Sequence, residues 1–429
     1  MIKERLISFL FIFYWIFLWG SINTAPYEII NLNEIISLDK NLWQGINSLR
    51  ILVPLVYTIL ITCYFLFVFF FKNLKIEKIN YYFLLFFISQ IIGLYFNKEK
   101  HFDIQGLYLA ILSIGTIFLF ILCNYKRINN IIKKFILIGI LFLGVVLILS
   151  ISIKLNDIKD FNFYEAFNNN NVNLMGQANP RITGLSRTLA IINLFIIVFF
   201  FNLKKPYFKK ILIVCLVLFS TLIIFMQSRG SIICYFFSLG FIILYLINSN
   251  RNFKIKYFFL FILLPFILYF LFTNNLNNKF INENKIENNR ILLTTSSGRY
   301  EILVHTLKNY DYNKFFGYGP NGDRFFLKDF DKKNKYGDNT SNNLLYSLVS
   351  GGYSSVFFLI LIYFEIIKLF TVYKEKILMD KSIYINFSFA CLIFFSIRSF
   401  FENSFGLFSI DFLITYMSIA YIISKNKIK

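Results

Sequence analysis

Long apolar runs recur along almost the whole chain, and they constrain its fold more than any other feature. Each has about 20 residues, enough to cross the roughly 30 Å hydrocarbon layer of a membrane as a helix. A chain with 57% hydrophobic and 20% aromatic residues also lies outside the usual composition of soluble domains. The sequence therefore predicts an all-α polytopic membrane protein with about 12 transmembrane helices. The predicted spans lie near 5–20, 51–71, 81–96, 107–124, 135–154, 187–203, 211–227, 230–249, 257–273, 343–370, 384–400 and 404–424.

The net charge of +21 is explained by topology, so nucleic acid is not a predicted partner. The basic residues lie mainly in alternate short segments between the apolar runs, such as KNLKIEK and KKPYFKK. Because Lys and Arg are enriched in cytoplasmic loops, these segments and both termini are predicted to be cytoplasmic. The first run lacks a clean small-residue cleavage site, so we expect it to remain as a helix.

This alternation places one long, patterned segment outside the cytoplasm. We expect residues 1–273 to form spans one to nine, 274–342 a large periplasmic loop containing helices, and 343–429 the last three spans, within one integral membrane domain. A loop this long is usually functional.

Within this loop, residues 296–310 predict an amphipathic helix with Ser296 and Ser297 as its caps. Its predicted apolar face consists of Tyr300, Leu303, Val304 and Leu307, and its polar face of Glu301, His305 and Lys308. The stretch FFGYGPNGDRF follows, and its Gly317 and Gly319 predict a sharp turn back toward the bundle.

Four arginines run against the positive-inside bias. They are Arg181, Arg229, Arg299 and Arg398. A guanidinium binds a diphosphate through two parallel hydrogen bonds and keeps its charge near a membrane, so these residues are candidate anion ligands. The alternative is that they snorkel or pair with Glu402, Asp338 or a lipid phosphate.

The sequence predicts no metal site and no cofactor. The five cysteines lie inside apolar runs without metal-binding spacing, and the only histidines, His101 and His305, lack a cluster of further ligands. Glu301 and His305 share a helix face, so an acid–base role for His305 stays open. No glycine-rich nucleotide-binding motif and no GxSxG motif is present.

Five motifs in order resemble one family. RITGLSRTLA, QSRGS, SSGRYEIL, FFGYGPNG and NTSNNLLYSLVSGGYSSV, over about residues 175–360, resemble the O-antigen ligase/polymerase superfamily of bacterial envelope glycosyltransferases. The resemblance implies a multi-pass protein of the bacterial inner membrane that acts on glycans carried by undecaprenyl diphosphate, with no nucleotide sugar and generally no metal. Its expected partners are this lipid-linked oligosaccharide, membrane lipids and, as a candidate, a chain-length regulator.

One departure favours the polymerase branch of this superfamily. Ligases resemble one another in an HN pair followed by about nine residues and a glycine-containing turn. Here Ser341-Asn342 or Asn342-Asn343 precedes LLYSLVSGG, and no histidine is present. We therefore expect a polymerase whose general base is unassigned, with Asp338 and Glu301 as candidates. Ser341 and Asn342 could hydrogen-bond the acceptor.

In the expected mechanism, Arg181, Arg229 and Arg299 bind the donor diphosphate while an acceptor hydroxyl attacks the anomeric carbon. Further candidate substrate-binding residues are His305, Gly317, Gly319, Arg398 and Glu402. Two alternatives stay open: a ligase that transfers glycan to lipid A-core, and a flippase for lipid-linked oligosaccharides. A flippase needs a polar path in the membrane, where this chain has few residues, the nearest being Gln90, Glu365 and Asp411.

Overall fold

The structure is a computed structural model, and its described residues form helices, turns and short irregular segments. It describes residues 2–21, 42–72, 74–96, 104–125, 129–154, 182–203, 205–246, 256–271, 299–312, 314–327, 340, 342–379 and 382–426. Within these ranges there is no strand, so the all-α prediction is confirmed. The helices are α1 (Ile2–Ser21), α3 (Leu42–Phe71), α4 (Lys78–Phe96), α5 (Ile104–Tyr125), α6 (Asn129–Lys154), α8 (Ile182–Asn202), α9 (Pro206–Phe225), α10 (Arg229–Phe241), η3 (Ile242–Leu246), η4 (Phe259–Leu263), α13 (Arg299–Asn309), α14 (Gly322–Phe326), α16 (Asn343–Met379), α17 (Ile383–Arg398) and α18 (Ile410–Asn426).

Seven helices in the described part of the chain are long and apolar enough to cross a membrane. They lie within α3, α4, α5, α6, α8, α9 and α16, and four shorter apolar helices accompany them. The chain is thus a multi-pass membrane protein, while the count of twelve spans stays a prediction. The last predicted span, 404–424, is corrected at its start, because residues 399–409 form turns and bends and α18 begins at Ile410.

The chain divides into two compact units. The first comprises Met1–Ile138, Ser296–Thr371 and Ser399–Lys429. Within it, α5 is the most buried span and packs against α3, α4 and α18. Gly115 of α5 explains the close approach to α3, because a Cβ at that position would lie 2.5 Å from a side-chain atom of Thr58.

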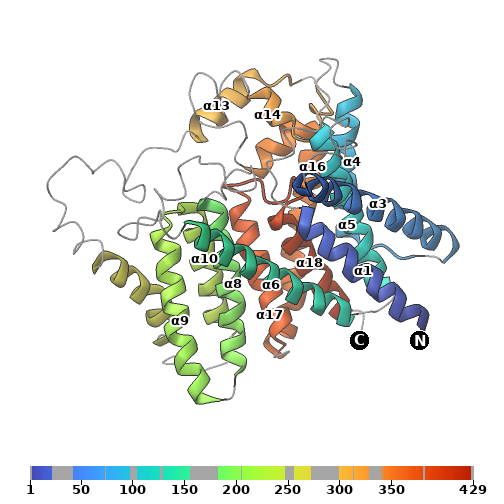
Figure 1. Ribbon diagram of the computed structural model, residues 1–429. Helices are drawn as coiled ribbons and strands as arrows, with labels where there is room; N and C mark the ends of the chain where they lie inside the picture. Colours follow the sequence, from blue (N-terminus) through green and yellow to red (C-terminus); the bar gives the residue numbers. More distant parts are fainter. Residues whose placement is uncertain are drawn as a thin grey trace. The chain divides into compact units, whose positions relative to one another are not determined.

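The second unit comprises Gly139–Thr295 and Val372–Arg398. Its helices α8, α9, α10 and α17 pack together, as Figure 1 shows for α8, α9 and α10. A buried polar network joins three of them: Asn193 Nδ2 donates to Ser220 Oγ at 3.2 Å and to Tyr235 Oη at 2.7 Å. Inside a membrane protein such interhelical hydrogen bonds satisfy polar groups that hydrocarbon cannot, so they fix the register of the three helices.

Candidate functional site

The structure describes most of the predicted site residues, but not all. Arg181, Asp338 and Ser341, the helix caps at 296–298 and His101 lie outside the described residues. The remaining residues fall into two groups, one in each unit, and each group is described by itself.

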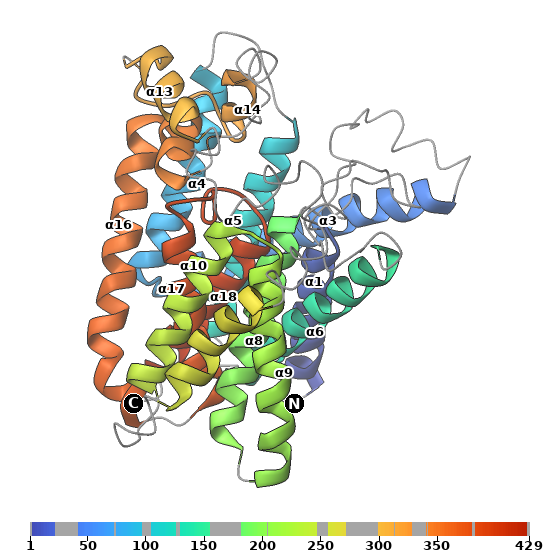
Figure 2. The ribbon, with the colours of Figure 1, turned by 90° about the vertical axis from the view of Figure 1, so that its left-hand side faces the viewer.

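In the first unit, α13 occupies most of the helix predicted from residues 296–310. Figures 1 and 2 both show α13 and α14 beside one end of α16 and α4. The predicted apolar face is wrong, because Tyr300 is 64% exposed and Leu307 40% exposed, whereas Ile302 and Thr306 are buried. Several apolar residues lie around this short helix, so its packed face depends on where the flanking chain is anchored.

Tyr310 provides that anchor. It follows Ile302 and Thr306 at successive four-residue steps, so all three lie on one side of α13. The Tyr310 ring packs in a buried cluster with Tyr318 and Val349 of α16. Burial raises the pKa of the Tyr310 phenol, with further increases from the neighbouring tyrosines and an aspartate, so it stays neutral at physiological pH.

Gly317 and Gly319 lie against a break in α16, where Gly352 has φ +67°. Tyr318 N–H donates to the Val349 carbonyl and Gly319 N–H to the Ser350 carbonyl, both at 2.8 Å. A Cβ at Gly317 would lie 2.3 Å from the Val349 oxygen. The motifs FFGYGPNG and SLVSGGYSS therefore meet backbone to backbone, which explains Gly317. Gly319 has φ +100°, and a Cβ there would lie 2.3 Å from the Leu94 side chain.

Two other helices, α4 and α5, also contact this loop closely. A Cβ on Gly93 of α4 would lie 3.0 Å from the Gly317 oxygen, and one on Gly106 of α5 would lie 2.2 Å from the Pro320 oxygen. The separation at Gly106 is possible only without a side chain, and the one at Gly93 leaves little room for a Cβ. The outer segment is thus held rigidly on α4, α5 and α16.

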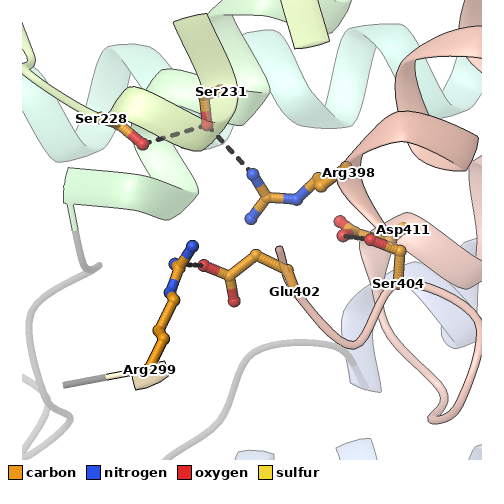
Figure 3. A network of polar contacts seen from close by, with 7 residues as sticks. All are labelled: Ser228, Ser231, Arg299, Arg398, Glu402, Ser404 and Asp411. Carbon is orange, nitrogen blue, oxygen red and sulfur yellow. Dashed lines mark hydrogen bonds and ion pairs between the residues drawn. The ribbon is translucent and has the colours of Figure 1, made fainter. Parts of the chain in front are cut away.

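Arg299 opens α13 on the side that carries Ile302 and Thr306. Its Nη2 donates to Glu402 Oε1 at 2.9 Å, and both side chains are partly exposed, 39% and 30% respectively (Figure 3). This ion pair joins α13 to the segment between α17 and α18. Pairing with Glu402 is the alternative that the sequence leaves open for these arginines, and Arg299 forms this pair.

Asn342 lies directly before α16 and Asn343 is its first residue, and the side-chain oxygen of each accepts a backbone N–H. Asn342 Oδ1 accepts the Leu345 N–H at 2.8 Å, as a helix cap does. Asn343 donates its own N–H to the Ser399 carbonyl at 3.0 Å, and its Oδ1 accepts the Phe405 N–H at 3.1 Å. The structure therefore gives both asparagines structural contacts at the place where ligases carry their HN pair.

In the second unit, Arg229 begins α10 directly after a tight turn in which Gln227 has φ +52°. Nearby, Ser231 Oγ accepts hydrogen bonds from Ser228 Oγ at 3.1 Å and from Arg398 Nη1 at 3.0 Å (Figure 3). Arg398 ends α17 and is buried, and Arg229 is half-buried. The end of α17 and the start of α10 thus place two arginines of one unit at the same end of these helices.

Arg187 of α8 is a candidate that the sequence motifs contain but that their interpretation misses. The helices α8 and α10 run in the same direction, because α9 connects them and runs in the opposite direction. The hydrogen bond between Asn193 and Tyr235 places these two residues at the same height along α8 and α10. Arg187 precedes Asn193 by six residues and Arg229 precedes Tyr235 by six, which is about 9 Å along each helix axis, so the two arginines also lie at the same height. The signal is in the printed RITGLSRTLA, whose second arginine is Arg187.

Two buried carboxylates also stand out in the first unit. Asp323 Oδ2 accepts hydrogen bonds from Thr340 N–H at 3.1 Å and Thr340 Oγ1 at 3.2 Å. Asp411 Oδ2 accepts a hydrogen bond from Ser404 Oγ at 2.9 Å. Both contacts tie loop to helix, and the described residues contain no group of three or more His, Cys, Asp and Glu side chains suited to a metal ion.

His305 Nδ1 lies 3.2 Å from Asn309 Nδ2, one turn later on α13. Its ring is half-buried and lies 6.1 Å from the ring of Phe326. These neighbours place the histidine on the surface of the helix.

Comparison with known proteins supports the order of motifs. No curated protein and no solved structure matches the chain. A family model described as O-antigen ligase matches residues 214–364, a segment that contains Arg229, α13, the glycine loop and the break in α16. Through residues 214–364 the chain is similar to the O-antigen ligase family, and its resemblance to the O-antigen ligase/polymerase superfamily is confirmed.

Proposed function

We propose that this protein is a glycosyltransferase of lipid-linked glycans and, more narrowly, a polymerase of surface-polysaccharide repeat units. The donor is a growing glycan on undecaprenyl diphosphate, and the acceptor is the next lipid-linked unit. The reaction takes place at the periplasmic face of the inner membrane, with both chain termini in the cytoplasm.

The start of α16 is the observation that carries the choice of polymerase over ligase. At this place, where the resemblance expects the histidine of a ligase, the chain has Ser341, Asn342 and Asn343. Asn342 and Asn343 hold backbone N–H groups through their side-chain oxygens. Eight residues, 343–350, separate the Ser341-Asn342 pair from the Gly351–Gly352 break, which is close to the about nine residues that the superfamily motif has after its pair.

The arginines supply the chemistry that this reaction needs. An acceptor hydroxyl oxygen forms a bond to the donor's anomeric carbon, the bond from that carbon to the diphosphate breaks, and the carrier leaves as undecaprenyl diphosphate. The leaving diphosphate gains negative charge, which guanidinium groups stabilise strongly in a site of low polarity. Arg187, Arg229 and Arg398 are suited to this task because a guanidinium binds a diphosphate through two parallel hydrogen bonds and keeps its charge near a membrane.

We also propose which groups could act as the base that takes up the hydroxyl proton. Asp338 and Glu301 are the carboxylate candidates; Glu301 lies half-buried in the first turn of α13. Arg299, in the first unit, is by itself a further candidate ligand for a phosphate of the lipid-linked substrate.

A reconstitution experiment tests the proposal and its alternatives together. The purified protein is placed in proteoliposomes with lipid-linked oligosaccharides extracted from cells that lack it, and products are resolved by mass. A polymerase yields lipid-linked chains of two, three and more units without any other acceptor. Transfer only after lipid A-core is added would identify a ligase, and movement between leaflets without a new glycosidic bond would identify a flippase.

A further inference from the structure

The Arg299–Glu402 ion pair is held in place by more than the contact between its two side chains. Among the residues that the structure describes, each of the two side chains has the other as its hydrogen-bonding partner. Isolated ion pairs with this exposure contribute little to stability. Contacts elsewhere in the first unit nevertheless hold both the segment that carries Glu402 and the helix α13 that carries Arg299.

Glu402 lies in a short segment that is tied down at several points. Asn343 binds this segment twice, through its N–H to the Ser399 carbonyl and through its Oδ1 to the Phe405 N–H. Asn403 Oδ1 accepts the Gly406 N–H at 3.1 Å, and a Cβ on Gly406 would lie 2.4 Å from the Tyr346 ring. The Glu402 backbone therefore has little freedom to follow Arg299.

Arg299 approaches this point from a helix that is anchored at its other end. Tyr310 is buried with Tyr318 and Val349, and Ile302 is buried between Tyr310 and the helix start. The pair thus holds one nitrogen of the guanidinium, Nη2, at the beginning of α13. An arginine has five N–H donors in a rigid fork, and one contact to Glu402 leaves other edges of the fork available to an anion.

Glu402 cannot itself bind a phosphate, because a carboxylate repels it. A role of Glu402 toward a phosphate would therefore act through Arg299, whose Nη2 donates to Glu402 Oε1. Given the proposed function, on which this inference rests, we propose that Glu402 is a positioning residue that orients Arg299 toward a phosphate of the lipid-linked donor. Orientation before binding spares the donor the cost of ordering a long, flexible side chain.

Kinetics on the full-length protein in proteoliposomes tests the role, with extracted lipid-linked oligosaccharide as the donor. Glu402→Ala should raise the donor KM by about 2- to 5-fold, the size of a partly exposed ion pair, while the unfolding temperature stays near that of the wild type. Glu402→Gln, which keeps an oxygen acceptor, should restore most of the affinity. In the Arg299→Ala background, Glu402→Ala should change the KM by less than about 1.5-fold, because the two residues act as a unit.

Glu365→Ala is the matched control, since it removes another glutamate of the same unit, whose carboxylate lies 4.0 Å from Lys368. It should leave the KM unchanged. A wild-type KM in Glu402→Ala would overturn the inference, as would an undiminished effect of Glu402→Ala in the Arg299→Ala background. A lower KM in Glu402→Ala would also overturn it, because Glu402 would then compete with the donor for Arg299. Failure of the wild-type protein to polymerise would refute the proposed function instead.

Discussion

Gly317→Ala tests whether the contact between the glycine loop and α16 holds the outer segment in place. The added Cβ would lie 2.3 Å from the Val349 oxygen and 2.7 Å from the Gly352 nitrogen, closer than real Cβ atoms come to other heavy atoms. These neighbours are backbone atoms, which cannot rotate away as a side chain can. The loop must therefore move, and the hydrogen bonds from Tyr318 and Gly319 to α16 must lengthen or break.

The expected loss follows from these two effects. Overpacking costs about 1 to 3 kcal/mol, and each of the two backbone hydrogen bonds contributes about 1 kcal/mol. We therefore expect Gly317→Ala to lower the free energy of unfolding by about 2 to 5 kcal/mol. Because Tyr318 packs on Tyr310, the displacement also reaches α13, and polymer formation should fall by about 100-fold, as a misplacement of roughly 1 Å can cause.

Thermal unfolding of the detergent-solubilised protein, followed by size-exclusion chromatography, measures the stability, and product length in proteoliposomes measures the activity. Gly144→Ala in α6 is the control, since a Cβ there would meet nothing within 4 Å. It should leave both readouts near the wild type. If Gly317→Ala unfolds at the wild-type temperature and makes full-length polymer, the loop is not held by this contact and the reasoning fails.

Arg229→Lys should reduce polymerisation nearly as much as Arg229→Ala, by about 30- to 150-fold at normal protein level, because a point charge cannot reproduce a bidentate contact; wild-type chain lengths in Arg229→Ala would show that this arginine only anchors the turn. Ile302→Asp should detach α13 and abolish polymer, since Ile302 is 1% exposed, whereas Leu307→Asp on the exposed side should be mild; equal effects would refute the packed face described above. In a variant whose native cysteines are replaced, a membrane-impermeant thiol reagent should label Lys308→Cys but not Asn130→Cys in intact cells; external labelling at residue 130 would contradict the predicted topology.

Much of the fold follows from composition and periodicity. Each of the twelve predicted spans overlaps an observed helix, because about 20 apolar residues can satisfy their backbone in hydrocarbon only as a helix. The error at 404–424 has a physical cause: Phe405, Leu407 and Phe408 are as apolar as a span. Asn343 and Gly406 nevertheless hold this stretch in turns through long-range backbone contacts that no local pattern encodes.

The candidate site divides in the same way. The arginines stay candidates from the sequence, because a positive charge outside the basic loops needs a reason. The motif order pointed to lipid-linked glycans, and the match over residues 214–364 supports it. Arg187 was missed because its level with Arg229 depends on the Asn193–Tyr235 hydrogen bond between two helices. The sequence did not predict which face of α13 is buried, because Tyr310, which lies just after the helix, decides this face.

The sequence by itself determined that this chain crosses a membrane many times, that it carries helices in a large polar segment and that its motifs resemble those of one superfamily. Hydrocarbon imposes these properties locally, through run length and charge placement. Only the tertiary structure decided that Gly317 packs against the broken α16, that Asn342 and Asn343 hold backbone, and that Arg299 meets Glu402. The Arg299–Glu402 partners lie 103 residues apart, so their meeting depends on the packing of α13, α16 and the 399–409 segment, which no local pattern in the sequence specifies.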